Sequence, residues 1–264
     1  MKPDKQSELS YQANELRKRF GEDLSSPIDV FAILQSQENL TLVFYPFSDR
    51  ISGMCVRARS GEQLIAINST RTLGRQRFTA AHELYHLYVQ DDIITLPAAG
   101  GATVICGSEI GAGRDEEEKN ADCFASYFLA PNDALRSFIE KNLLKGARRP
   151  IVVEDVVRIE QHFRMSRQAT LYRLVGDGWI TFDFANTLRH DIIVSARRLG
   201  FSNELYVPTP EDRQYFASGS YIGLAERLRG SDVISNGKYE ELLLDAYRAD
   251  IVYNLEPEGR ETYD

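Results

Sequence analysis

Hydrophobic and polar residues repeat along the chain with two different periods, which predict helices around a small group of strands. Apolar residues recur with helical spacing over residues 7–20 and 27–37. Three short apolar runs follow, at residues 40–47, 53–59 and 63–68, and a Ser-Gly pair supplies a turn between the last two. We therefore expect a small antiparallel sheet in this part of the chain.

Two stronger helical patterns flank a stretch that has no helical period. The first runs from about Thr72 to Gln90, and the second from about Asp115 to Leu129, where it ends before a proline. Residues 93–113 between them are rich in glycine and alanine. We expect this stretch to be a loop that is mobile without substrate, because it joins the two helices that carry the candidate chemistry.

The remainder of the chain is predicted to be mainly helical. Helices are expected at about residues 132–144, 152–163, 166–175, 210–228 and 236–249, with a strand at 178–184. The polar, acidic tail from Glu256 is expected to be disordered. We divide the chain into a domain of residues 1–184, which includes a helix-turn-helix-like segment at about 152–175, and a mainly helical extension of residues 185–264.

The helix from Thr72 contains a pattern with a specific chemical meaning. Residues 78–87 read Phe-Thr-Ala-Ala-His-Glu-Leu-Tyr-His-Leu. His82 and His86 are four residues apart, so both imidazoles project from one face of a helix and can bind one zinc ion. Glu83 follows His82 and can reach a water molecule at the metal without occupying the metal itself. We expect Glu83 to be the catalytic base.

A catalytic zinc ion needs a third protein ligand and leaves one position for water. The helix at 115–129 has an apolar stripe, and Glu118 and Asp122, four residues apart, border it and can point inward together. We expect Glu118 to bind the metal. Asp122 would accept a hydrogen bond from the non-ligating nitrogen of a zinc-bound histidine. Glu117, on the other flank of the stripe, is the alternative ligand.

Charge and cysteine content narrow the class of protein. The formal net charge of −8 disfavours non-specific nucleic-acid binding, although it leaves room for a local basic patch. Three scattered cysteines do not make a disulfide framework. Neither a secretory signal nor an apolar run of membrane-spanning length is present in the sequence. We therefore expect a soluble cytoplasmic protein with no membrane partner.

Several segments together resemble the ImmA/IrrE family of metallo-endopeptidases. The resemblance covers about residues 9–180 and rests on Ile65-Ala66-Ile67-Asn68, Arg77-Phe78-Thr79 leading into the His-Glu-x-x-His segment, Glu118-x-x-Ala121-Asp122-x-Phe124-Ala125, and Ser166-Arg167-Gln168-Ala169. Two positions depart from the family pattern, which often has glycine at Tyr85 and glutamate or glutamine at Asn120. Neither residue is a predicted ligand, so the metal prediction is unaffected.

The resemblance implies a fold, a cofactor and a partner. The fold is α+β: a zincin-like minimal peptidase core with a small antiparallel sheet, the HExxH helix and the glutamate-bearing helix, followed by the helix-turn-helix-like segment. The cofactor is one Zn²⁺ per chain. The partner is a helix-turn-helix regulator or antitoxin encoded nearby, which the enzyme would cleave. Alternatives are a toxin that acts on another cellular protein, and a non-catalytic, zinc-stabilised regulatory binding module, which has no use for Glu83.

Weaker signals leave further alternatives open. His162, His190 and Tyr172 are equal candidates for stabilising an oxyanion, and packing or solvation is the simpler interpretation for each. Arg71, Arg75 and Arg77 precede or open the zinc helix and are either solvated or in contact with an acidic partner. The helix that begins near Ser166 resembles a DNA-reading helix, but the acidic charge favours a packing role. Substrate is expected to bind as a strand along an edge of the residue 40–68 sheet.

Overall fold

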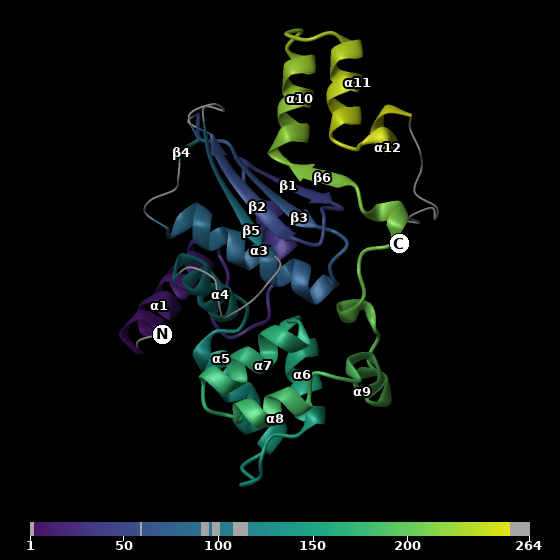
Figure 1. Cartoon of the computed structure of the whole chain (residues 1–264). Coiled ribbons are helices and arrows are strands. Elements are labelled where there is room, and N and C mark those ends of the chain that lie inside the picture. Colours follow the sequence, from purple (N-terminus) through teal and green to yellow (C-terminus); the bar gives the residue numbers. More distant parts are fainter. Residues whose placement is uncertain (1–2, 59, 91–94, 97–100, 108–115, 254–264) are drawn as a thin grey trace, which may run out of the picture.

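The protein has an α+β fold in which helices pack around one mixed β-sheet (Figure 1). The computed structural model describes residues 3–58, 60–90, 95–96, 101–107 and 116–253. Within this part of the chain the sheet has the strand order β4-β5-β2-β3-β1-β6. The α+β class predicted from the sequence is confirmed. None of the helices in the described residues combines the length and apolar character needed to cross a membrane.

The sheet is mixed, whereas the sequence predicted an antiparallel one. β1 (Leu40–Tyr45) runs parallel to β3 (Gln63–Asn68), and β2 (Ile51–Ala58) runs antiparallel to β3. β3 therefore lies between the two strands that precede it in the chain. Its last four residues are all buried, which suits a central strand covered on both faces better than the outer strand of a meander.

Two strands lie in the stretch that was predicted to be a loop. β5 (Gly101–Gly107) pairs antiparallel with β2 from Ala58 to Ile51, and β4 (Thr95–Leu96) pairs with the start of β5. The run Thr-Val-Ile at the centre of β5 has high β-propensity, but the surrounding glycines hid it in the sequence pattern. The other residues of the predicted mobile loop lie outside the described part of the chain.

The strand pairing removes the predicted substrate position along residues 40–68. The outer side of β2 pairs with β5, and the outer side of β1 pairs with β6 (Phe216–Gly219). Both edges of this group of strands are therefore occupied by strands from elsewhere in the chain. The prediction failed because the sequence pattern gave no sign that distant segments would join the sheet.

One face of the sheet is covered by the helices that carry the predicted site. α3 (Leu73–Tyr88) packs against β2 and β3, α4 (Glu116–Leu129) packs against α3, and α1 (Pro3–Arg19) packs against α4. α2 (Val30–Gln35) is capped by the preceding residue, Asp29, whose carboxylate accepts hydrogen bonds from two backbone N–H groups. The main hydrophobic core lies between the sheet and these helices, and α3 is buried along nearly its whole length.

A second group of helices lies below the sheet in Figure 1. It comprises α5 (Asn132–Ser137), a π-helical turn (Phe138–Leu144), α6 (Val153–Phe163), α7 (Arg167–Gly176), α8 (Phe182–Thr187) and α9 (Ile192–Arg198). α6 and α7 form the predicted helix-turn-helix-like pair. α8 stands where a strand was predicted at 178–184, because the hydroxyl of Thr181 accepts a hydrogen bond from the N–H of Phe184 and caps a helix.

The C-terminal region contributes to the sheet and then forms a helical projection. Two short 3₁₀ turns (Glu204–Tyr206 and Glu211–Arg213) lead into β6, followed by α10 (Ser220–Gly230), α11 (Asn236–Asp245) and α12 (Ala249–Val252). The single helix predicted at 210–228 is thus a strand and a helix, separated at Gly219, whose φ of 96° favours glycine. The division into domains at residue 184 stays a prediction, and the predicted disordered tail lies outside the described residues.

Candidate metal centre

The structure brings the three predicted metal ligands together. His82 and His86 are one turn apart on α3, are almost fully buried, and have their Nε2 atoms 3.1 Å apart. Glu118, in the first turn of α4, places one carboxylate oxygen 3.6 Å from His82 Nε2 and the other 3.4 Å from His86 Nε2. The three side chains offer ligand atoms that all lie within 4.8 Å of one another, so they could hold a metal ion.

The contacts on the far side of each imidazole test whether these residues fit a cation. His82 Nδ1 lies 2.9 Å from a carboxylate oxygen of the buried Asp122, and His86 Nδ1 lies 2.6 Å from the amide oxygen of Gln90. Both partners are acceptors, so each Nδ1 carries the proton in the neutral imidazole. The two Nε2 lone pairs then face each other across 3.1 Å. A cation between them removes that repulsion, so the residues fit a metal ion.

Gln90 was missed by the sequence interpretation. Gln90 follows His86 by four residues, just as His86 follows His82. A spacing of four places side chains on the same face of a helix. The role of Gln90 is parallel to that of Asp122, because both hold an imidazole through Nδ1. The spacing of four from His86 was visible in the sequence. Gln90 was overlooked because it lies beyond the end of α3 and because glutamine is rarely considered as the hydrogen-bond acceptor of a metal-binding histidine.

Glu83 lies beside this cluster and is completely buried. Neither of its carboxylate oxygens has a hydrogen-bond partner among the described residues. A buried carboxylate without a partner is costly, so its presence in a folded protein calls for an explanation, and a catalytic role is one. Glu83 is therefore a buried carboxylate, next in sequence to His82, that no hydrogen bond among the described residues accounts for.

Gly53 on β2 makes room for Glu83. A Cβ atom at position 53 would lie 3.0 Å from a carboxylate oxygen of Glu83 and 2.5 Å from the methyl carbon of Thr79. β2 and α3 can approach this closely only because residue 53 has no side chain. Sequence reasoning missed this residue, although a glycine inside a strand is a recognised sign of close backbone approach.

Glu117, the alternative ligand, lies outside the cluster. One of its oxygens accepts a hydrogen bond of 2.6 Å from the Tyr85 hydroxyl, and the other accepts one of 3.3 Å from the Asn120 amide. Burial, reinforced by Glu117, raises the pKa of Tyr85 above its usual range. Tyr85 and Asn120 are the two departures from the family pattern, and Glu117 connects them. The two departures therefore belong to one hydrogen-bonded group next to the cluster.

The weaker candidates take other roles in the structure. His162 stacks on the Phe138 ring with centroids 4.0 Å apart, and burial lowers its pKa. His190 is exposed, and Tyr172 is half-exposed. Arg77 is buried and donates to the Ile28 carbonyl and the Asp29 carboxylate, so it is not a solvated charge. No hydrogen bond in the described residues joins His162, His190 or Tyr172 to the cluster.

Comparison with known proteins identifies the family. No curated protein shows a significant match to the chain. Residues 27–175, more than half of the chain, match the profile of Peptidase_M78, described as an IrrE N-terminal-like domain. The matched segment includes α3 and α4, which carry the metal cluster, and most of the helix-turn-helix-like pair. The chain therefore belongs to the Peptidase_M78 family of IrrE N-terminal-like domains.

Proposed function

We propose that this protein is a zinc-dependent endopeptidase in which His82, His86 and Glu118 hold the ion and Glu83 is the general base. The observation that carries the proposal is the buried Glu83 carboxylate, which lacks a hydrogen-bond partner among the described residues and lies beside the histidine and glutamate cluster. Two imidazoles and one carboxylate are a ligand set that catalytic zinc sites use, with a fourth position left for water.

Each residue of the site then has a separate task. Such an ion, when bound, would polarise a water molecule and the carbonyl group of the scissile peptide bond. Glu83 accepts the proton of the attacking water and transfers it to the leaving amine. Asp122 and Gln90 keep the two imidazoles in the tautomer whose Nε2 faces Glu118. Burial of the cluster keeps bulk water away from Glu83.

The substrate that we propose is a specific protein, namely a helix-turn-helix regulator or antitoxin encoded near this protein. The support for this choice is the resemblance to the ImmA/IrrE family. A toxin that cleaves another cellular protein would use the same site and differ only in its substrate. A non-catalytic binding module would need the three metal ligands but would gain nothing from a buried carboxylate at position 83, so the environment of Glu83 favours an enzyme.

The experiment that tests this proposal compares three glutamate-to-glutamine variants. Glu83→Gln should retain one zinc ion per chain and lose about 10²–10⁴-fold in cleavage rate, because the amide cannot accept a proton. Glu118→Gln should lose affinity for zinc. Glu117→Gln is the matched control: it changes the same charge one residue away from the ligand and outside the cluster, and should retain metal and activity.

The measurements are metal content by elemental analysis and cleavage of the neighbouring helix-turn-helix protein by mass spectrometry. If Glu83→Gln cleaves that protein at the wild-type rate, the general-base mechanism is wrong. If the wild type binds zinc but leaves every candidate regulator intact, a regulator is not the substrate, and the binding-module function replaces the endopeptidase if no other cellular protein is cleaved either.

A further inference from the structure

A pocket of about 280 Å³ lies among α1, α4, α7 and α8, and it is separate from the metal cluster. Neither the three metal ligands nor Glu83 is among the described residues that line it. Its walls are mainly apolar and include three aromatic rings; these wall residues are Tyr127, Leu171, Tyr172, Val175, Phe182 and Ala185. None of these side chains has a task in the proposed reaction.

Two of the aromatic side chains in this pocket are largely exposed. Tyr172 is 50% exposed and Phe182 is 61% exposed, so the pocket opens to solvent at these residues. A single exposed aromatic residue on a protein surface is ordinary. Two that border one cavity form an apolar surface, and a surface of that kind often marks a binding site. A ligand with an apolar ring would cover both.

The charged residues of the pocket leave one cation without a partner. Arg173 and Asp177 form an ion pair with each other at 2.8 Å, so their charges cancel. The remaining charged residue among those described in the walls is Arg189, which is exposed. Its side chain has neither a hydrogen bond nor an ion pair with any described residue. The pocket therefore suits a ligand that carries one negative charge.

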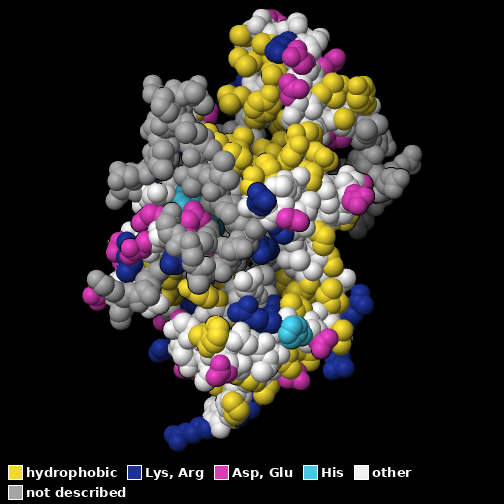
Figure 2. Space-filling model, in the orientation of Figure 1, with side chains coloured by type: hydrophobic (Ala, Val, Ile, Leu, Met, Phe, Trp, Pro, Cys, Tyr) yellow, Lys and Arg dark blue, Asp and Glu magenta, His cyan; other side chains and the backbone are white. Residues whose placement is uncertain are grey.

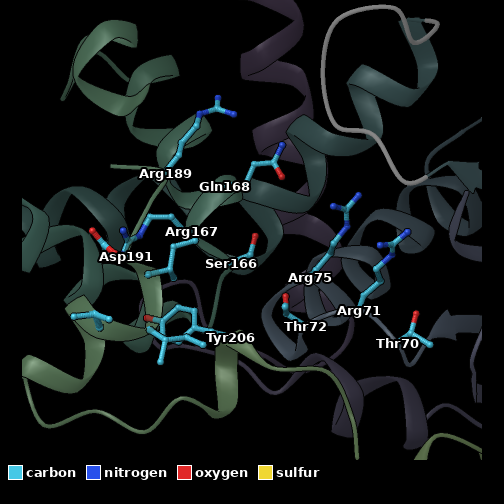
Figure 3. A pocket seen from close by; sticks show the side chains of 13 residues that line it. Thr70, Arg71, Thr72, Arg75, Ser166, Arg167, Gln168, Arg189, Asp191 and Tyr206 are labelled. Atoms are coloured by element: carbon cyan, nitrogen blue, oxygen red, sulfur yellow. The ribbon is translucent and has the colours of Figure 1, made fainter. Parts of the chain in front are cut away.

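Gln168 accompanies Arg189 at the open side of the pocket. Both residues also line the neighbouring pocket shown in Figure 3, where their side chains extend in the same direction, away from Tyr206. The Gln168 side chain is likewise exposed and without a hydrogen bond in the described part of the chain. A guanidinium and an amide can both donate N–H groups to one carboxylate. Figure 2 shows basic side chains in the middle of this face, between the sheet and the lower helices.

The size and the backbone of the pocket favour a small molecule over a peptide. An apolar cavity of about 150 Å³ can hold benzene, so 280 Å³ has room for a ring with a short acidic side chain. Apart from Asp177 and Arg189, the lining residues belong to helices, whose backbone N–H and C=O groups bond within the helix. Such walls lack the row of free main-chain groups that holds an extended peptide on a strand edge.

We propose that this pocket binds a small aromatic carboxylate, with its ring against Tyr172 and Phe182 and its carboxylate on Arg189 and Gln168. The planar guanidinium of arginine suits a carboxylate, because it can form two parallel hydrogen bonds with it. The exposed rings supply apolar area and the edge-to-face or offset contacts that aromatic groups prefer. The site does not depend on the peptidase reaction, so it stands or falls separately from the proposed function.

Binding of a model ligand to the full chain tests the pocket directly. The probe is 3-phenylpropionate, and its controls are 3-phenylpropanamide, which lacks the charge, and propionate, which lacks the ring. Titration by isothermal calorimetry, supported by saturation-transfer NMR, should give a Kd of about 1 mM or tighter for the probe. Both controls should bind at least about tenfold more weakly, because each lacks one of the two groups that the pocket recognises.

Two variants locate the bound probe. Arg189→Gln should weaken binding about tenfold or more, since a hydrogen bond between charged groups is lost. Tyr172→Ala should weaken it about two- to tenfold through loss of the aromatic contact. The matched controls are Arg198→Gln, an exposed arginine on α9, and Tyr11→Ala, an exposed tyrosine on α1. Neither residue lines the pocket, so both control variants should bind the probe like the wild type.

Three results would overturn the inference. Arg189→Gln could bind the probe as tightly as the wild type does, which is also the result expected if the carboxylate binds a metal ion at the histidine cluster instead. The amide could bind as tightly as the acid, which would remove the role of the charge. A tetrapeptide Ala-Ala-Ala-Phe with a free carboxyl end could bind more tightly than the probe, which would assign the pocket to the end of a protein chain.

Discussion

Replacing Gly53 with alanine tests how closely the sheet must approach the proposed catalytic base. The new methyl group would lie 2.5 Å from the Thr79 methyl carbon and 3.0 Å from a Glu83 carboxylate oxygen. Carbon atoms in contact are ordinarily about 3.5–4.0 Å apart, so β2 and α3 must separate by about 1 Å. Thr79 cannot easily turn away, because it is buried and branched at Cβ.

The expected consequences are a loss of both stability and activity. Overpacking of this kind costs about 1–3 kcal/mol in the free energy of unfolding. A displacement of about 1 Å at the base is enough to lower the cleavage rate by about 10²-fold. Metal binding should change little, because none of the three atoms nearest to a Cβ at position 53 belongs to a metal ligand. The assays are denaturant unfolding, metal content and cleavage of the neighbouring helix-turn-helix protein.

The matched control is Gly223→Ala in α10. A Cβ atom there meets nothing within 4 Å, so the substitution should be neutral or should stabilise the helix by up to about 1 kcal/mol. If Gly53→Ala unfolds at the wild-type denaturant concentration and cleaves at the wild-type rate, the tight contact between β2 and Glu83 has no functional importance. If only the activity falls, the contact positions Glu83 without contributing to stability.

Two further substitutions test the contacts around the site and below it. Asp122→Asn should lower zinc affinity by about 10–100-fold in a chelator competition assay, because the amide holds His82 Nδ1–H less strongly than the carboxylate does. Asp155→Asn should lower the free energy of unfolding by about 1–3 kcal/mol at neutral pH. Burial opposes the ionisation of Asp155, but hydrogen bonds from Arg149 and the Val152 N–H outweigh it and hold its pKa below the usual range. Its stabilisation is therefore complete above about pH 4 and is lost as the pH falls through the lowered pKa, so denaturation curves of variant and wild type should converge in acid.

The parts of the site that the sequence could predict are those encoded within single helices. The spacing of His82 and His86 fixes their common face, and the apolar stripe of α4 turns Glu118 and Asp122 inward. Glu118 was preferred to Glu117, which borders the same stripe, because Asp122 follows Glu118 by four residues and can point inward with it. These predictions need only the helical period, which does not depend on the arrangement of the rest of the chain.

The parts that could not be predicted depend on contacts between distant segments. The role of Gly53 arises from the contact between β2 and α3, and the sheet order brings in β5 and β6 from outside residues 40–68. The order of the strands depends on how all of them compete for the buried central positions of the sheet. A local sequence pattern carries no information about that competition. Thr181 shows a local failure: its neighbours alternate like a strand, but a side-chain cap starts a helix there.

The position of α4 depends on two buried arginines that come from either side of it in the sequence. Arg17 of α1 donates 2.9 Å hydrogen bonds to the carbonyls of Phe128 and Asp23. Arg173 of α7 donates to the carbonyls of Ser126 and Ala130, at 2.9 and 2.8 Å. The bonds to Phe128 and Ala130 satisfy carbonyls at and just beyond the end of α4, whereas the Ser126 carbonyl also accepts a hydrogen bond from the Ala130 N–H.

This arrangement gives the helix-turn-helix-like pair a structural task in the peptidase. α7 is held to the end of α4 by Arg173, whose guanidinium also lies 4.2 Å from the centre of the Tyr127 ring. The start of the same helix abuts the start of α3, since a Cβ atom on Gly74 would lie only 2.9 Å from the backbone nitrogen of Ser166. α7 therefore contacts both helices that carry the metal cluster, at the end of one and the beginning of the other.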